Sequence, residues 1–136
     1  FAAMRVVNDP TIGSSSGTHA APSPMTIRQI LSHTSGMSHG IAQIAYDKEL
    51  WNGIILNGKL KTLEQRTSAL AKIPLAFDPG TKWNYSFSPD LVGRLVEVLS
   101  GKPLDAYLQE YIFTPLDMKN SGYNQSTIIH QTPKNG

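Results

Sequence analysis

The chain has 136 residues, of which 40% are hydrophobic, and a formal net charge of +2. This size and composition suit one domain with a hydrophobic core and exclude a disordered chain. The basic residues are scattered and leave no nucleic-acid footprint, no apolar run approaches the length that spans a bilayer, and the absence of cysteine excludes disulfides and thiolate zinc sites.

The first residues lack the order of a signal peptide, and the chain does not begin with Met. We therefore expect a processed or excised piece of a longer protein. Residues 8–24 are rich in Ser, Gly and Pro and are predicted to form a flexible, exposed loop. Within them Gly13–Gly17 matches the G-x-S-x-G pattern of a nucleophile elbow, but the required strand and helix do not flank it. We interpret this segment as part of the loop.

A capping box opens the first predicted helix. Gln29 follows Thr26 by three residues, which predicts a helix over 27–32. His33 and Ser35 come directly after it. A catalytic pair would need an acidic residue to orient the imidazole, and none is near in the sequence. We interpret both side chains as partners for backbone groups of the loop.

A second capping box, Thr62 with Gln65, predicts a helix that runs to about Ile73. Between the two boxes, residues 41–58 have a helix-like apolar pattern that Gly breaks. Trp51 in this stretch is interpreted as a packing residue, with a place on the wall of a substrate cleft as the alternative.

The most strongly signalled helix begins near Ser88, a natural N-cap, with Pro89 at its first position. Apolar residues recur at helical spacing until Gly101, which supplies a left-handed stop. The turn residues 78–80 lie ahead of it. One of the five tyrosines, Tyr85, is therefore held just before a rigid helix start.

A last helix is predicted from Pro103 to just before Pro115, and residues 124–136 are predicted to be a frayed tail. No alternating pair of strands with hairpin chemistry and no internal repeat is found. The sequence thus predicts a mainly α fold, a single helical domain over residues 1–136 with long loops.

Three blocks of this sequence occur in the order that they have in one protein family. Together they resemble the serine β-lactamase-like and penicillin-binding-protein-like enzymes, in particular class C β-lactamases and related esterases. The resemblance covers residues 24 to 123 and implies the helical domain of a fold whose parent is α+β. The blocks are Met25–Met37 (the family's TIRxLLxHTSGL), Phe77–Gly101 (Pro-Gly, Tyr-Ser-x and Glu-x-x-Ser-Gly) and Ile112–Met118 (IFxPLGM).

The resemblance implies an active site of three parts: a Ser-x-x-Lys nucleophile motif, a Tyr-x-x motif, and a Lys-Thr-Gly-like strand. This chain contains only the tyrosine motif, as Tyr85-Ser86-Phe87. The resemblance therefore implies that Tyr85 is the catalytic general acid or base. It also implies that an α/β domain, absent from this chain, is the partner that holds the nucleophile, so the chain alone is expected to be inactive.

Phe87 departs from the asparagine that β-lactamases usually have at this position, which favours an esterase. Phe87 and Trp83 are candidate substrate-binding residues. The alternative is that Trp83, Tyr85 and Phe87 form one packed aromatic cluster. Asp117 replaces a family glycine at a predicted helix-end turn, where Asp tolerates a left-handed conformation.

The leading hypothesis is thus a parent serine hydrolase that forms an acyl-enzyme with a small-molecule ester, β-lactam or peptide, without a cofactor or a metal. The alternative is a non-catalytic helical binding or scaffold module. A metal hydrolase is disfavoured because the four histidines (His19, His33, His39 and His130) do not lie at i, i+4 spacing. The resemblance suggests a periplasmic or secreted parent, and a cytoplasmic one stays open.

Overall fold

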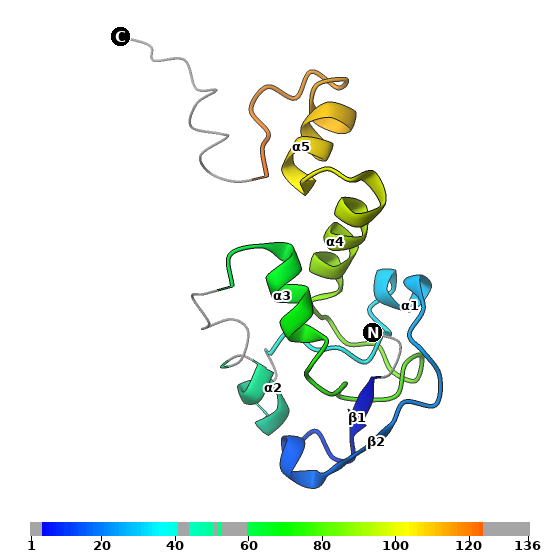
Figure 1. The fold of residues 1–136 in the computed structure, drawn as a ribbon. Coiled ribbons are helices and arrows are strands. Elements are labelled where there is room, and N and C mark those ends of the chain that lie inside the picture. Colours follow the sequence, from blue (N-terminus) through cyan, green and yellow to red (C-terminus); the bar gives the residue numbers. More distant parts are fainter. Residues whose placement is uncertain (1–3, 41–43, 51, 53–59, 124–136) are drawn as a thin grey trace. The chain divides into compact units, whose positions relative to one another are not determined.

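The computed structural model describes residues 4–40, 44–50, 52 and 60–123, and helices dominate them (Figure 1). This confirms the mainly α fold. The chain divides into two compact units, Phe1–Val92 and Gly93–Gly136, where the sequence predicted one domain. None of the helices in the described ranges is long and apolar enough to cross a membrane. The elements are β1 (Arg5–Val7), the 3-10 turn η1 (Gly13–Ser16), β2 (Thr18–Ala20), α1 (Ile27–Leu31), α2 (Ala45–Leu50), α3 (Leu63–Leu70), α4 (Ser88–Ser100), α5 (Leu104–Leu108) and the π-helical turn η3 (Gln109–Phe113).

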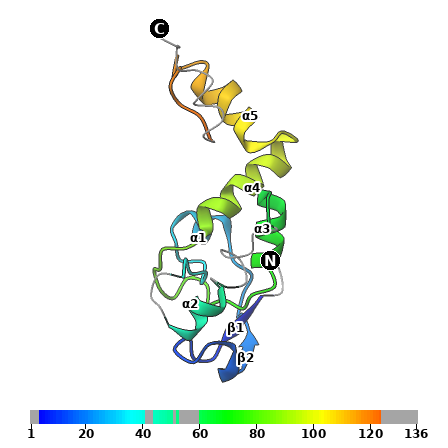
Figure 2. The ribbon, with the colours of Figure 1, turned by 90° about the vertical axis from the view of Figure 1, so that its left-hand side faces the viewer.

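A small antiparallel sheet forms where the sequence indicated no strand pair. β1 and β2 lie side by side in both views (Figures 1 and 2), with Arg5 opposite Ala20. On its other edge β1 meets Leu75 in a parallel bridge, where Leu75 N–H donates to Arg5 O at 2.7 Å. The range 8–24 therefore holds a turn and a strand, unlike the flexible loop that was predicted. Three-residue strands are too short to show an alternating pattern.

The G-x-S-x-G segment is the turn η1. It is fixed to α2, because the Ser14 N–H donates to both carboxylate oxygens of Glu49 at 3.1 Å. Gly13 has φ +76, and a Cβ there would lie 2.5 Å from Glu49 Oε1. No helix follows the turn, so the segment is no nucleophile elbow.

Both predicted capping boxes are present. Thr26 Oγ1 accepts from the Gln29 N–H at 3.2 Å, and Gln29 Oε1 accepts from the Thr26 N–H at 2.8 Å, so two otherwise unpaired donors at the start of α1 are satisfied. Thr62 and Gln65 do the same for α3. α3 ends at Leu70, earlier than predicted, and a turn follows.

Two hydrophobic clusters form the core of the unit that contains β1. Successive side chains of a strand point to opposite faces, and here Val6 enters one cluster while Val7 enters the other. β1 thus lies between them, which explains why so short a strand is ordered. The first cluster comprises Val7, Tyr46, Leu50, Leu70, Ala76 and Phe87. The second comprises Met4, Val6, Ile30, Met37, Leu75 and Leu91.

α4 ends as the sequence predicted. Gly101 has φ +69, and its N–H donates to Glu97 O at 2.9 Å. Farther on, Asp117 has φ +54 at the turn after η3, which confirms the left-handed conformation expected for it. Trp51 and the predicted frayed tail 124–136 lie outside the described residues.

Candidate functional site

The loop that follows α1 runs beside the segment that leads into α4. Backbone hydrogen bonds join them along their length: Ala76 N–H to Gly36 O at 2.8 Å, Gly80 N–H to Thr34 O at 2.7 Å, Asn84 N–H to His33 O at 2.9 Å and Phe87 N–H to Ser38 O at 3.3 Å. Two of the sequence blocks that were far apart in the chain are therefore one structural feature. This feature, residues 33–38 with 76–88, is called the paired loops below.

Gly36 is required where the paired loops approach most closely. Its φ is +89, and a Cβ on it would lie 2.3 Å from the carbonyl oxygen of Phe77. Residues other than glycine rarely adopt this φ, and no Cβ fits at that distance from an oxygen. The glycine thus permits the backbone contact that supports the segment carrying Tyr85.

Tyr85 lies on the surface of the paired loops, with 49% of its side chain exposed. Its ring stacks on His33 with a centroid distance of 4.9 Å and an interplanar angle of 29°, and it tilts against His39 at 5.3 Å. Trp83 is more exposed and meets the His33 ring edge-on at 6.1 Å. The phenol is therefore accessible, while its ring is held by aromatic neighbours.

Phe87 has a different environment from the other two aromatic residues of the motif. Only 6% of it is exposed, it belongs to the first core cluster, and His39 stacks on it at 4.7 Å. Of the predicted aromatic cluster, Trp83 and Tyr85 thus face outward and Phe87 faces inward. Direct contact between Phe87 and a substrate stays a prediction, and the burial favours a packing role instead.

A chain of buried hydroxyl groups lies beneath His33. His33 Nδ1 is 3.2 Å from Ser86 Oγ, Ser86 Oγ is 2.7 Å from Ser88 Oγ, and Ser88 Oγ is 3.3 Å from Ser35 Oγ. All three serines are at most 1% exposed. His33 and Ser35 are not hydrogen-bonded to each other. Ser35 Oγ accepts from the backbone N–H of Met37, as expected, whereas the His33 ring meets the Ser86 hydroxyl and not a backbone group. The spacing of residues in the sequence did not indicate that His33 contacts Tyr85 and Ser86. The one available signal was that all three residues lie in sequence blocks of the same family.

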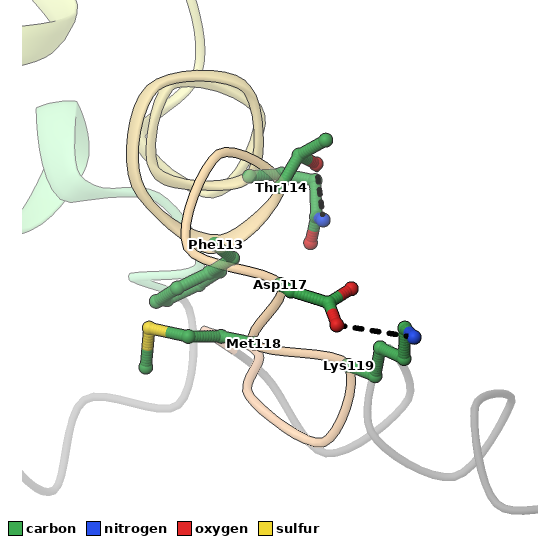
Figure 3. A pocket seen from close by; sticks show the side chains of 6 residues that line it. Phe113, Thr114, Asp117, Met118 and Lys119 are labelled. Carbon is green, nitrogen blue, oxygen red and sulfur yellow. Dashed lines mark hydrogen bonds and ion pairs between the residues drawn. The ribbon is translucent and has the colours of Figure 1, made fainter.

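Two of the cavities in the described part of the chain differ in what surrounds them. One of about 210 Å³ adjoins the paired loops and is lined by Ile30, Leu31, His33, Pro89 and Val92. The larger, about 380 Å³, lies in Gly93–Gly136 (Figure 3). Its polar side chains bond to one another, Lys119 to Asp117 at 3.2 Å and Gln109 to Thr114 at 3.0 Å. The smaller of these two cavities is thus the one beside the candidate site.

No group of three His, Asp or Glu side chains in the described part of the chain is placed to hold a metal ion. Arg94 pairs with Glu97 at 3.2 Å, and Lys82 is exposed. The chemically distinctive groups of the site are therefore the phenol of Tyr85 and the two imidazoles against it.

The family model described as Beta-lactamase matches residues 10–135. The chain belongs to the β-lactamase family. Esterase EstB of Burkholderia gladioli is 35% identical over 103 residues, which are 73% of this chain and 26% of that protein. The β-lactamase-family chain thus spans about a quarter of the length of this curated relative.

Solved structures of the β-lactamase family agree. The chain is similar to EstCE1, described as a hydrolase with promiscuous acyltransferase activity, with a TM-score of 0.61 and 28% identity over 83% of this chain and 29% of that one. It is also similar to simvastatin synthase (LovD) from Aspergillus terreus, with a TM-score of 0.63 and 27% identity over 96% of this chain and 31% of that one. Esterases, acyltransferases and amidases are thus the relatives of this β-lactamase-family chain.

Proposed function

We propose that the protein carrying this chain is a serine hydrolase that forms an acyl-enzyme with an ester, and that Tyr85 transfers a proton in that reaction. The observation that carries the proposal is the placement of Tyr85: the tyrosine of the family motif is half exposed, while its ring is fixed by the paired loops. A proton-transfer group needs both access to the reacting atoms and a fixed position.

The chemistry assigned to Tyr85 is simple. A serine hydroxyl is a weak nucleophile until a neighbouring base accepts its proton. In the proposed reaction the serine oxygen forms a bond to the carbonyl carbon while its proton passes to the phenolate of Tyr85. The bond between the carbonyl carbon and the alcohol oxygen then breaks, and the phenol returns this proton to the alkoxide that leaves. The serine, and the lysine that favours the phenolate, lie outside these 136 residues in this proposal.

An ester is favoured over a β-lactam by three observations. Phe87 occupies the motif position at which the family resemblance implies an asparagine in β-lactamases, and phenylalanine has no hydrogen-bonding group. The relatives named above are described as an esterase and as a hydrolase with acyltransferase activity. The small cavity beside His33 is apolar on most sides, which suits an acyl chain better than a charged group.

The test compares two tyrosines in the intact protein. Tyr85→Phe removes the proton-transfer group, and we expect kcat for hydrolysis of p-nitrophenyl acetate to fall about a hundredfold to ten-thousandfold. Tyr111→Phe is the matched control, because Tyr111 is 53% exposed and thus equally accessible. A Tyr85→Phe protein with near-normal kcat would contradict the assignment. Faster turnover of a chromogenic cephalosporin than of the ester would make the protein a β-lactamase, and no turnover of either would favour the scaffold alternative.

A further inference from the structure

His33 connects the exposed phenol to the buried hydroxyl groups. One face of its ring stacks on Tyr85 at 4.9 Å, and its Nδ1 lies 3.2 Å from Ser86 Oγ. A ring held by both a stacking contact and a hydrogen bond has a defined orientation. Ser86 is the residue next to Tyr85, so the same segment supplies both contacts.

The direction of the protons in the hydroxyl chain follows from its buried end. Ser35 is fully buried and accepts from the Met37 N–H, and its other oxygen neighbour in the described part of the chain is Ser88 Oγ. The Ser35 proton therefore goes to Ser88, the Ser88 proton to Ser86, and the Ser86 proton to His33 Nδ1. In the reverse direction a buried Ser35 proton would have no acceptor, which is costly.

This direction determines the form of the imidazole. Nδ1 is an acceptor, so the neutral ring carries its proton on Nε2. A histidine's tautomer is set by the hydrogen bond that its other nitrogen makes. Three buried serines thus favour the Nε2-protonated tautomer of the half-buried His33 ring.

The backbone of His33 is also unusual. Its φ is +56, a left-handed conformation that is uncommon for residues other than glycine, although His, like Asn and Asp, adopts it more often than most. Its carbonyl accepts from the Asn84 N–H at 2.9 Å, next to Tyr85. A non-glycine residue kept in a strained conformation points to a need for its side chain.

We propose that His33 is a positioning residue that holds the phenol of Tyr85 in its reactive orientation, and that the chain Ser35–Ser88–Ser86 selects, of the two tautomers of its neutral imidazole, the one with the proton on Nε2. The inference rests on the proposed role of Tyr85. His33 touches no reacting atom in it and acts through the tyrosine ring.

The activity test uses two variants in the intact protein. His33→Asn keeps a residue that tolerates the left-handed backbone and a polar atom near Ser86 while it removes the ring beneath Tyr85. We expect kcat for p-nitrophenyl acetate to fall about tenfold to a hundredfold with KM little changed, because orientation is lost and binding is not. His33→Phe restores a ring and recovers part of the loss. His19→Asn is the control for removing a histidine and leaves kcat unchanged.

A double-mutant cycle separates positioning from a general loss of structure. If His33 acts through Tyr85, adding His33→Asn to Tyr85→Phe causes no further decrease in kcat. Equal losses in both backgrounds would overturn the inference, as would an unchanged kcat of His33→Asn alone. A Tyr85→Phe protein that stays active refutes the proposed function instead, so the two failures are distinguishable.

Ring nitrogen NMR tests the tautomer without activity. In the intact protein labelled with ¹⁵N, His33 is expected to show a protonated Nε2 and an unprotonated Nδ1. Ser86→Ala removes the donor to Nδ1, and both tautomers then appear. A His33 that carries its proton on Nδ1 in the unaltered protein would overturn the assignment.

Discussion

Tyr46 and Tyr85 show how differently one side chain is used in the same unit. Tyr46 is 2% exposed, belongs to the first core cluster, and donates its hydroxyl to Pro74 O at 2.7 Å. Burial, with a smaller effect of the nearby Asp47 and Glu49 charges, raises its pKa above the usual range for a tyrosine. Tyr85 has half of its side chain in solvent and imidazole rings as neighbours. The hydroxyl of Tyr46 is thus held as a hydrogen-bond donor, whereas the side chain of Tyr85 is accessible to solvent, as the proposed proton transfer requires.

Exposure alone does not separate a structural tyrosine from a reactive one. Tyr111 is as exposed as Tyr85, but its neighbours are Lys102, whose Nζ lies 5.1 Å from the ring centroid, and Tyr107. What distinguishes Tyr85 is the combination of access with a ring fixed by residues from a distant part of the chain. The following predictions test that distinction.

The largest expected effect comes from Gly36→Ala. The new Cβ would meet Phe77 O at 2.3 Å in a backbone with φ +89, so we expect a loss of roughly 3 kcal/mol in the free energy of unfolding. Gly101→Ala is the matched control, because Gly101 also has a positive φ but nothing lies within 4 Å of its Cβ position. Urea unfolding measures both. Equal losses would mean that backbone conformation alone, and not the close contact in the paired loops, requires Gly36.

Tyr46→Phe and Tyr85→Phe should give opposite results. Tyr46→Phe leaves the Pro74 carbonyl without its donor, and we expect a loss of about 2 kcal/mol with activity retained. Tyr85→Phe keeps the ring contacts, so its free energy of unfolding should stay within about 0.5 kcal/mol of the original. Denaturant unfolding and esterase assays on the same samples provide the comparison. If Tyr85→Phe lowers the free energy of unfolding as much as Tyr46→Phe does, the predicted difference between the two hydroxyl groups is wrong.

The two capping boxes separate stability from function. Thr26→Ala and Thr62→Ala each remove an N-cap bond, and each should cost about 1 kcal/mol. α1 leads directly into His33, whereas α3 does not, so Thr26→Ala alone should also lower kcat. Thermal unfolding and kinetics of both variants check this. If both variants lower kcat equally, the effect of Thr26→Ala on kcat does not come from local support of His33 by the cap of α1.

The smallest effect is expected at the surface pair Lys102–Glu110, where Lys102 Nζ lies 2.5 Å from Glu110 Oε2. The hydrogen bond from Lys102 lowers the pKa of Glu110. Its contribution to stability is therefore present above the ordinary carboxyl pKa of 4.5 and is lost as pH falls through the lower value in the folded state. Glu110→Gln should reduce this pH dependence slightly and leave activity unchanged, measured as thermal unfolding midpoints between pH 2 and 7. A large change in activity would mean that the residues around Tyr111 contribute to catalysis, which the proposed function does not expect.

Local signals allowed much of the fold to be predicted. Capping boxes at Thr26 and Thr62, the stop at Gly101 and the left-handed Asp117 depend on residues within one or two turns of each other, and the structure has all four. The position of Tyr85 just ahead of α4 was likewise readable from turn and cap residues.

Non-local pairings could not be predicted in the same way. β1 and β2 have three residues each, and the order of β1 depends on Leu75 far along the chain. His33 lies 53 residues from Ser86, and nothing in either segment indicates that they meet. A single sequence records residue types and spacing, whereas these contacts arise from how the paired loops fold together.

The strand β1 has hydrogen-bonded neighbours on both of its edges, β2 on one and Leu75 on the other. A strand in that situation cannot be trimmed without releasing two other segments, and one of them leads within ten residues to Tyr85. A shortened chain that starts after Val7 should therefore lose order in the segment that carries Tyr85, although that segment lies far from the removed residues in the sequence.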